Sequence, residues 1–142
     1  MRLAIKTYSF NTEERLKSRK LIETLFREGK AFSVFPYRVL FMRVDHPGSK
    51  YPAQAGFTVS TKRFPHAVDR NRVKRLTREC WRLQKQPFYD YLAEHSCQLA
   101  IFFIYTDKKI APYPLLQEKV SVILKKLEKE VLKLALPDKP AL

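Results

Sequence analysis

The chain has 142 residues, a length typical of one domain, and 45% of them are hydrophobic, which is enough for a core. Its 28 Lys and Arg residues against 14 Asp and Glu residues give a net charge of +14, which favours a polyanion such as nucleic acid as the partner. The sequence has no long apolar stretch and no signal-peptide pattern, so we expect a cytoplasmic protein that does not insert into a membrane.

A helix is predicted after a short N-terminal arm. Residues 1–9 have no clear periodicity and are predicted to be flexible. Thr12 is a candidate N-cap, acids follow it where the helix dipole favours negative charge, and no Gly or Pro interrupts the chain before Gly29. We therefore expect a helix over residues 13–28. Its apolar residues form two stripes, Leu21 with Leu25 and Ile22 with Phe26.

Two strands are expected next. Residues 35–44 (FPYRVLFMRV) place apolar side chains on both faces, which predicts a strand buried on both sides. A turn is expected at residues 46–49, and β-branched and aromatic residues return at residues 55–61 (AGFTVST). The two strands are predicted to pair as an antiparallel hairpin.

The last part of the chain predicts a strand and a helix. Residues 97–105 (CQLAIFFIY) are apolar enough for a central strand. Residues 115–134 repeat apolar side chains at helical spacing, which predicts a long amphipathic helix. Its inward face consists of Leu116, Val120, Ile123, Leu127, Val131 and Leu134. The tail 137–142 is expected to be disordered, which leaves one domain over residues 10–136.

A strongly basic helix is predicted between the second and third strands, over residues 69–83 (DRNRVKRLTRECWRL), with Asp69 as its N-cap. The stripe expected to face the core consists of Val73, Leu76, Cys80 and Leu83. On the opposite side, within an arc of about 100°, we expect a ribbon of cations. These are Lys74, Arg75, Arg78, Arg82 and Lys85.

The ribbon stacks like charges, since Lys74, Arg78 and Arg82 follow one another at intervals of four residues. Such pairs repel, whereas a solvated helix face normally mixes acids with bases. Phosphates would relieve the repulsion, and guanidinium groups bind them in a bidentate fashion. The residues alone leave a merely solvated charged face as the alternative.

No catalytic or metal-binding group is predicted. Cys80 and Cys97 belong to no C-x-x-C pair and are expected to be buried, reduced thiols. The histidines stand singly, and the acids are dispersed or lie where a helix terminus or neighbouring lysines explain them. An independent nuclease would need acids gathered around metal ions, so we expect no active site in this chain.

A dense and ordered set of residues in and before the basic helix carries a family resemblance. It consists of Val59-Ser60, Lys62-Arg63, Ala67-Val68, Arg70-Asn71-Arg72, Lys74-Arg75, Arg78-Glu79 and Arg82. A weaker match lies at Arg15-Leu16-Lys17, Phe26 and Gly29-Lys30. In this order the residues resemble the protein component of bacterial ribonuclease P, over roughly residue 15 to the end of the chain.

The resemblance implies a single-domain α+β fold, an α-β-β-α-β-α sandwich with a left-handed βαβ crossover, like domain 2 of ribosomal protein S5. It implies the non-catalytic protein subunit of ribonuclease P, which binds the catalytic RNA and the 5′ leader of precursor tRNA and assists removal of the leader. Catalysis would belong to the RNA, and magnesium would be bound mainly by RNA, with none bound by the protein alone. We expect no membrane partner and no obligate protein partner.

The resemblance also implies two RNA-binding surfaces. The residues expected to meet the catalytic RNA are Arg70, Asn71, Arg72, Lys74, Arg75, Arg78 and Arg82. Those expected to line the leader cleft are Ile22, Phe26, Phe41, Ser60 and Lys62. Taken without the family, a broad apolar helix stripe is usually ordinary core.

The sequence departs from the family pattern at two places. Ile22 stands where related proteins often have an aromatic residue, so apolar contact is expected there instead of stacking. Residues 63–66 replace a shorter connection, and Phe64 is expected to act as a hydrophobic staple for the basic helix.

Two other functions fit the composition. A ribosomal or other structural RNA-binding protein would share the charge and the mixed fold. A helix-turn-helix DNA-binding protein would need a short helix and turn before the basic helix, and none is visible in the sequence.

Overall fold

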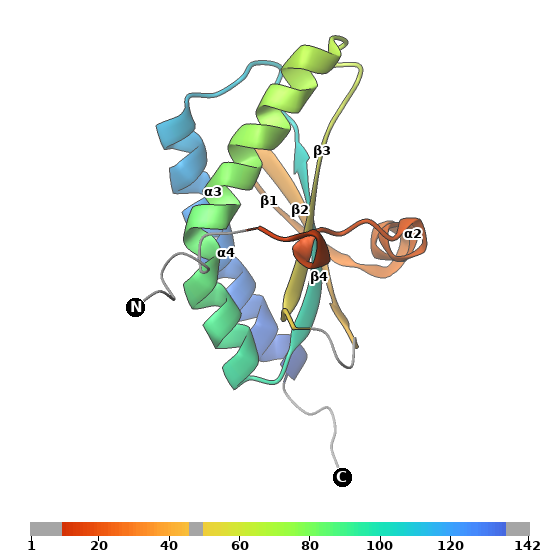
Figure 1. Cartoon of the computed structure of the whole chain (residues 1–142), viewed down its shortest axis with the longest axis vertical. Coiled ribbons are helices and arrows are strands. Elements are labelled where there is room, and N and C mark those ends of the chain that lie inside the picture. Colours follow the sequence, from red (N-terminus) through yellow and green to blue (C-terminus); the bar gives the residue numbers. More distant parts are fainter. Residues whose placement is uncertain (1–9, 46–49, 136–142) are drawn as a thin grey trace.

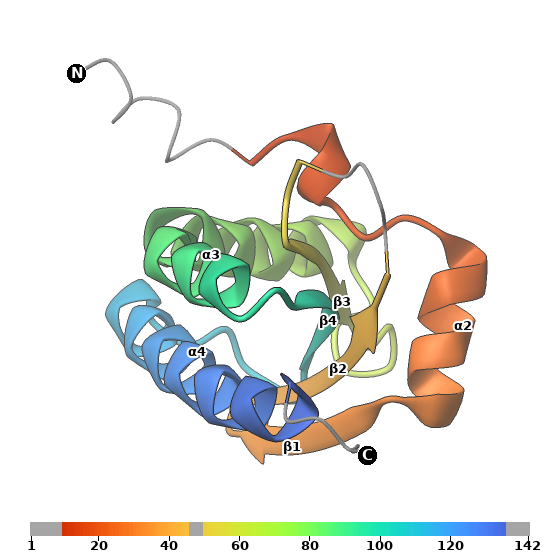
Figure 2. The same cartoon turned by 90° about the horizontal axis from the view of Figure 1, so that it is seen from below.

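The computed structural model describes residues 10–45 and 50–135. A four-stranded sheet has α3 (Ala67–Glu94) and α4 (Tyr113–Ala135) on one face, and α2 (Arg19–Glu28) crosses the other (Figure 1, Figure 2). The α+β class is confirmed. The expected turn at residues 46–49, the arm at residues 1–9 and the tail at residues 137–142 lie outside the described residues, so the domain bounds stay a prediction.

The sheet is built around its most apolar strand. The strands are β1 (Lys30–Val34), β2 (Tyr37–Val44), β3 (Ala53–Val59) and β4 (Gln98–Tyr105), in the spatial order β1-β2-β4-β3. Strand β4 pairs antiparallel with β2 and parallel with β3. Its residues Ile101 and Phe103 are buried against α3 and α4, and Phe102 is buried on the face that α2 covers. The predicted central strand is confirmed.

The predicted hairpin is wrong. Strands β2 and β3 are separated by β4, and the antiparallel hairpin partner of β2 is β1, which the sequence did not predict. Residues Phe35 and Pro36 form the turn between β1 and β2, not the start of a strand. Strand β1 lies at the sheet edge with Phe32 and Val34 only half-buried, so its hydrophobic pattern is weak. The prediction paired two strands that are consecutive in the sequence. The insertion of β4 between them depends on contacts across the whole fold, which the sequence pattern does not show.

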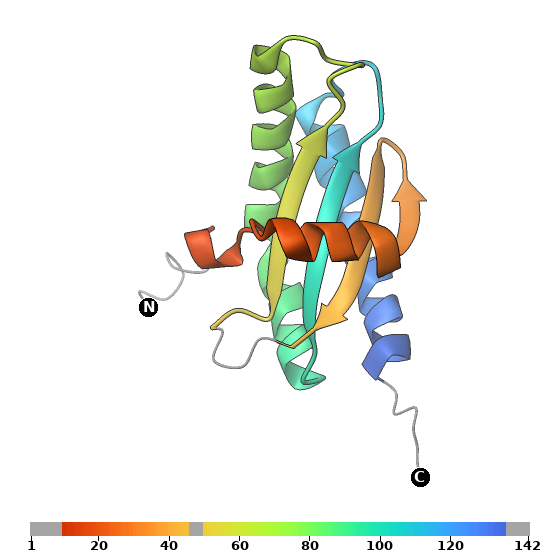
Figure 3. The same cartoon turned by 90° about the vertical axis from the view of Figure 1, so that its right-hand side faces the viewer.

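The connection from β3 through α3 to β4 has the uncommon hand. In Figure 3 both strands run in the same direction, α3 lies behind the sheet and β4 lies to the right of β3. The crossover is therefore left-handed, as the family resemblance implied. Most parallel crossovers have the opposite hand.

The predicted first helix is broken in two. A 3₁₀ turn, η1 (Thr12–Glu14), is followed by an extended stretch, and α2 begins after Ser18, whose Oγ accepts a hydrogen bond from the backbone N–H of Leu21 at 3.2 Å. The N–H of Leu16 donates to the carbonyl oxygen of Ala55 on β3 at 3.0 Å. Within a continuous helix this N–H would be used internally. Thr12 is thus not the cap of a long helix.

The basic helix α3 is longer than predicted and turned slightly from its predicted core stripe. Its N-cap is His66, while Asp69 lies in the first turn, and it continues past Pro87. The predicted core residues Val73 and Cys80 are buried, whereas Leu83 is 38% exposed. Because 3.6 residues per turn make a straight stripe drift over a long helix, the later inward positions are taken by other side chains. They are Trp81, Phe88 and Leu92.

Two further expectations are confirmed, and a third is confirmed in part. Helix α4 buries Leu116, Val120, Ile123, Leu127 and Val131, with Leu134 partly buried. Both cysteines are buried and free, and burial raises the pKa of the Cys80 thiol to about 12. Phe64 is buried, with its ring 6.0 Å from that of Tyr105 on β4, so it packs inside the protein as expected, while its role as a staple for α3 stays a prediction.

Candidate RNA-binding surfaces

The outer side of α3 presents several cations without acid partners. Asn71, Arg72 and Arg75 are exposed, and Lys74 and Arg78 are half-buried. Across residues 10–45 and 50–135, neither Lys74 nor Arg75 nor Arg78 forms an ion pair. Burial, and then the charges of Arg15 and Arg75, lower the pKa of Arg78, which marks a region of concentrated positive charge.

Two predicted RNA-binding arginines also have partners within the protein. The Nη1 of Arg70 donates to the carbonyl oxygens of Phe64 and Pro65, at 2.8 and 2.9 Å, and so fixes the loop that leads into α3. The guanidinium of Arg82 pairs with Glu79, with Nε 3.1 Å from Oε1. Both side chains remain partly open to solvent, but part of their donor capacity is already used.

Lys85 does not belong to the basic ribbon, contrary to the prediction. It is 2% exposed and forms an ion pair with Glu14, which is itself buried. The hydroxyl of Tyr89 donates to the same Glu14 oxygen at 2.7 Å. Helical periodicity correctly gives the side of α3 on which Lys85 lies, but it does not reveal that the segment around η1 covers this end of the helix.

The second surface lies where α2 crosses the sheet. Leu25 of α2 is fully buried against Leu40 and Phe102. Phe26 is 54% exposed, and its ring meets that of Phe102 edge to face, with the centroids 5.5 Å apart. A Cβ atom at the neighbouring Gly56 would lie 2.6 Å from a ring carbon of Phe102, so the absence of a side chain there lets this ring lie close to β3. An aromatic face is thus offered beside a buried aromatic platform.

Phe41 does not face this surface, which corrects its assignment to the expected leader cleft. Only 1% of it is exposed, and it belongs to the core beneath α3 and α4, with its ring 5.7 Å from that of Phe32. Side chains alternate along a strand, so its neighbours Leu40 and Met42 point toward α2 instead. Ile22 is partly buried on the α2 side and packs with them.

Beyond α2, the same face of the sheet is more open. Thr58 and Ile104 are half-buried neighbours in the strand register, and Arg38 is exposed beside Ile104. The predicted Ser60 and Lys62 follow the end of β3, with the Lys62 N–H donating to the Ser60 Oγ at 3.1 Å and the Lys62 side chain exposed. Arg38 was missed by sequence reasoning, although an arginine inside a mostly apolar strand was a visible signal.

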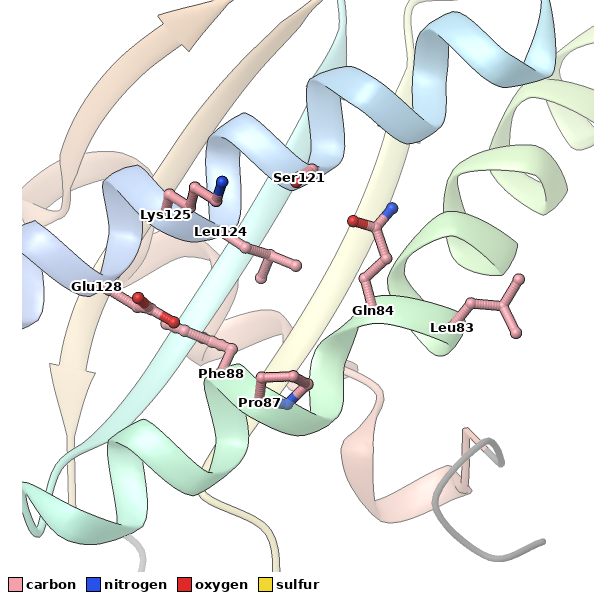
Figure 4. Close-up of a pocket in the computed structure, with 8 residues that line it drawn as sticks. All are labelled: Leu83, Gln84, Pro87, Phe88, Ser121, Leu124, Lys125 and Glu128. Atoms are coloured by element: carbon pink, nitrogen blue, oxygen red, sulfur yellow. The ribbon is translucent and has the colours of Figure 1, made fainter. Parts of the chain in front are cut away.

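The described residues contain no recognisable catalytic centre. Among them, no three His, Cys, Asp or Glu side chains gather into a group that could hold a metal ion. A groove of about 310 Å³ between α3 and α4 is lined by apolar and polar side chains in equal number, among them Leu83, Leu124 and Glu128 (Figure 4). In that groove the amide of Gln84 already donates to the carbonyl of Gln117 at 3.0 Å. It has no pair of acids for general acid–base chemistry.

Sequence comparison identifies the family. The profile of the family named Ribonuclease P matches residues 10–128, which includes both surfaces described above. The chain belongs to the ribonuclease P protein family. A ribonuclease P protein component from Porphyromonas gingivalis is 38% identical over 107 residues, covering 75% of this chain and 77% of the relative. Another, from Chlorobium phaeobacteroides, is 33% identical over 125 residues, covering 82% and 86%.

Solved structures of ribonuclease P proteins have the same fold. The protein from Thermotoga maritima aligns with a TM-score of 0.62 at 25% identity, over 80% of this chain and 96% of its own. The protein from Staphylococcus aureus aligns with a TM-score of 0.62 at 21% identity, over 80% and 94%. The predicted membership of the ribonuclease P protein family is confirmed, and the alternatives of a ribosomal protein or a helix-turn-helix protein are not favoured.

The relatives are named as the protein component of ribonuclease P, and membership of this family implies an RNA partner for the chain. No helix among these residues is long and apolar enough to cross a bilayer. The question for function is therefore which surfaces meet RNA.

Proposed function

We propose that this protein is the RNA-binding subunit of ribonuclease P. It binds the catalytic RNA through the outer side of α3 and holds the 5′ leader of precursor tRNA between α2 and the open face of the sheet. By doing so it assists endonucleolytic removal of the leader, which makes the 5′ end of mature tRNA. Its place of work is the cytoplasm, and it needs no obligate protein partner.

The observation that carries this proposal is the set of unpaired cations on α3. Lys74, Arg75 and Arg78 lie within two turns of one helix, and in the described part of the chain they meet no acid. Like charges at this spacing repel, and a phosphate backbone removes the repulsion while its counterions are released. Exposed Asn71 and Arg72, in the turn before them, extend the same surface.

The exposed ring of Phe26 supports leader binding. Proteins hold single-stranded RNA mainly by stacking unpaired bases on aromatic side chains and by pairing phosphates with cations. Phe26 offers the ring, Arg38 is an exposed cation on the same face of the sheet, and Lys62 is an exposed cation just after the end of β3. Ile22 contributes apolar contact, and Ser60 orders the backbone before Lys62.

The chemistry belongs to the RNA partner in this proposal. The chain supplies positive charge and shape, and magnesium is bound by RNA and substrate phosphates. Divalent cations also neutralise RNA phosphates, so the protein should increase the rate of leader removal most at low magnesium concentration.

Reconstitution tests the proposed function. Ribonuclease P RNA from the same genome is mixed with a precursor tRNA that carries a leader, with and without the protein, at low and high magnesium concentration. We expect the protein to raise the rate of leader removal strongly at low magnesium and less at high magnesium. Equal rates with and without the protein at low magnesium would refute the proposal. The protein alone is expected to cleave nothing.

A further inference from the structure

The segment between η1 and α2 is fixed at both ends. At one end, Glu14 is buried between Lys85 and Tyr89 of α3, and its second carboxylate oxygen accepts the backbone N–H of Asn11 at 2.9 Å. At the other, Leu16 donates to the carbonyl oxygen of Ala55 on β3. Figure 3 shows this segment leaving α3 and crossing the outer strand of the sheet.

Arg15 is the residue held between these two anchors. It forms a parallel bridge with Ala55, its side chain is exposed, and its guanidinium carbon lies 5.3 Å from the centre of the Phe10 ring. Phe10 in turn packs edge to face on Phe57. The position of Arg15 is therefore defined by its neighbours, although its donors face solvent.

Arg15 supplies positive charge on the side of α3 where the ion pair with Glu14 neutralises Lys85. Arg78 and Lys85 are seven residues apart, which puts them on one side of α3 about 10 Å from each other. Glu14 neutralises Lys85, and the next residue in the chain, Arg15, supplies a cation whose charge acts on Arg78. Of the causes that lower the pKa of Arg78, the charge of Arg15 comes second after burial.

Positive charge continues past Arg15. Lys17, Arg19 and Lys20 are all exposed, and the first turn of α2 contains no acid. Cations at the start of a helix oppose its dipole. Within the described residues Arg15 has no ion pair to offset its charge. A polyanion lying along this edge would compensate all of these charges at once.

We propose that Arg15 is a further RNA-contacting residue, so that the surface for the catalytic RNA bends from the outer side of α3 around the outer edge of the sheet at β3. This inference rests on the proposed function. The RNA phosphate backbone is the ligand, bound by a guanidinium group that the buried contacts of Glu14 hold in place.

The test is a binding titration of ribonuclease P RNA with intact protein at several salt concentrations. We expect Arg15→Ala to weaken binding about tenfold and to lower the salt dependence by about one counterion. Arg15→Lys keeps the charge but loses the bidentate guanidinium group. It should therefore retain the salt dependence and lose less affinity than Arg15→Ala. Arg27→Ala is the matched control, because it removes the same group from an exposed site already paired with Glu28.

The outcomes separate this inference from the proposed function. Thermal unfolding of each variant shows whether loss of the contact with Phe10 alters the fold. If Arg15→Ala binds like Arg27→Ala while Arg75→Ala with Arg78→Ala binds weakly, only the role of Arg15 is refuted. If all of these variants bind like the unmodified protein, both are refuted. A loss of stability with an unchanged salt dependence would assign Arg15 to the fold and overturn the inference.

Discussion

The two halves of α3 carry cations at the same helical spacing but in opposite surroundings. Arg78, in the first half, is half-buried beside Arg75 and Arg15 and has no acid partner among the described residues. Lys85, two turns later on the same side, is buried and paired with Glu14. The difference does not come from the helix itself. It comes from the segment around η1, which covers one half and leaves the other open.

This contrast separates cations that support the fold from cations available to a partner. A buried ion pair becomes costly when one member is removed, because the other is left without water or a counter-charge. An exposed cation contributes little to stability and can contribute much to binding. Substitutions in the two halves should therefore give different phenotypes.

The largest effect is expected in the covered half. Glu14→Ala leaves Lys85 buried without a counter-charge and removes the acceptor of Tyr89, so we expect a loss of about 3–5 kcal/mol in the free energy of unfolding. Urea denaturation measures it. Adding Lys85→Met should restore much of the stability, since no buried charge then remains. If Glu14→Ala were as stable as Arg75→Ala, the contrast between the halves would disappear.

Substitutions in the open half of α3 should affect RNA binding more than stability. Arg75→Ala combined with Arg78→Ala should change stability little but weaken binding to ribonuclease P RNA by roughly 2–4 kcal/mol at low salt. The salt dependence of binding should fall by about two counterions. Lys129→Ala with Lys133→Ala on α4 is the control, because it removes two exposed cations from another helix. An equal loss of affinity in that control would mean that net charge, and not this surface, determines binding.

A smaller effect is expected at the cleft. Phe26→Ala should reduce the preference for precursor over mature tRNA by about 1–3 kcal/mol, the range for loss of a stacked base, with little change in affinity for the catalytic RNA. Competition binding with the two tRNA forms measures it. Leu132→Ala, at another exposed apolar residue, is the control. Equal losses for both tRNA forms would show that Phe26 does not contact the leader.

The smallest effect concerns the buried side of α3 at alkaline pH. Burial raises the pKa of Cys80 from about 9 in the unfolded chain to about 12 in the folded protein, so the folded state retains the proton longer. Its contribution to stability is complete below pH 9 and is lost as the pH rises toward 12, by at most about 1.4 kcal/mol per pH unit. Denaturation of Cys80→Ala between pH 9 and 10.5 should show a shallower decline than the unmodified protein. Parallel declines would contradict the raised pKa.

Sequence reasoning succeeded where one element determines its own environment. The residues from Leu116 to Val131 repeat on one face of α4, and any partner for that helix must cover this face. The apolar run of β4 likewise requires cover on both sides. The positions of Arg75 and Arg78 opposite the core stripe follow from helix geometry alone.

Sequence reasoning failed where contacts with a distant segment determine the surroundings of a residue. Lys85 was assigned to the basic ribbon because periodicity gives no information on what η1 covers. Phe41 was assigned to the cleft although the adjacent positions of β2 face it, and an error of one residue in a strand moves a side chain to the opposite face. The break before Ser18 depends on a hydrogen bond to β3, which lies some forty residues away along the chain.

The close approach at Gly56 has a consequence for how mutational data on this protein should be interpreted. Even a methyl group there must displace the Phe102 ring on which Phe26 rests, so the exposed aromatic would shift without being altered itself. Substitution of Gly56 should therefore change substrate preference, although Gly56 is buried and cannot contact a nucleotide. Such an effect would arise from a shift of the Phe102 ring beneath Phe26, not from an additional contact with the RNA.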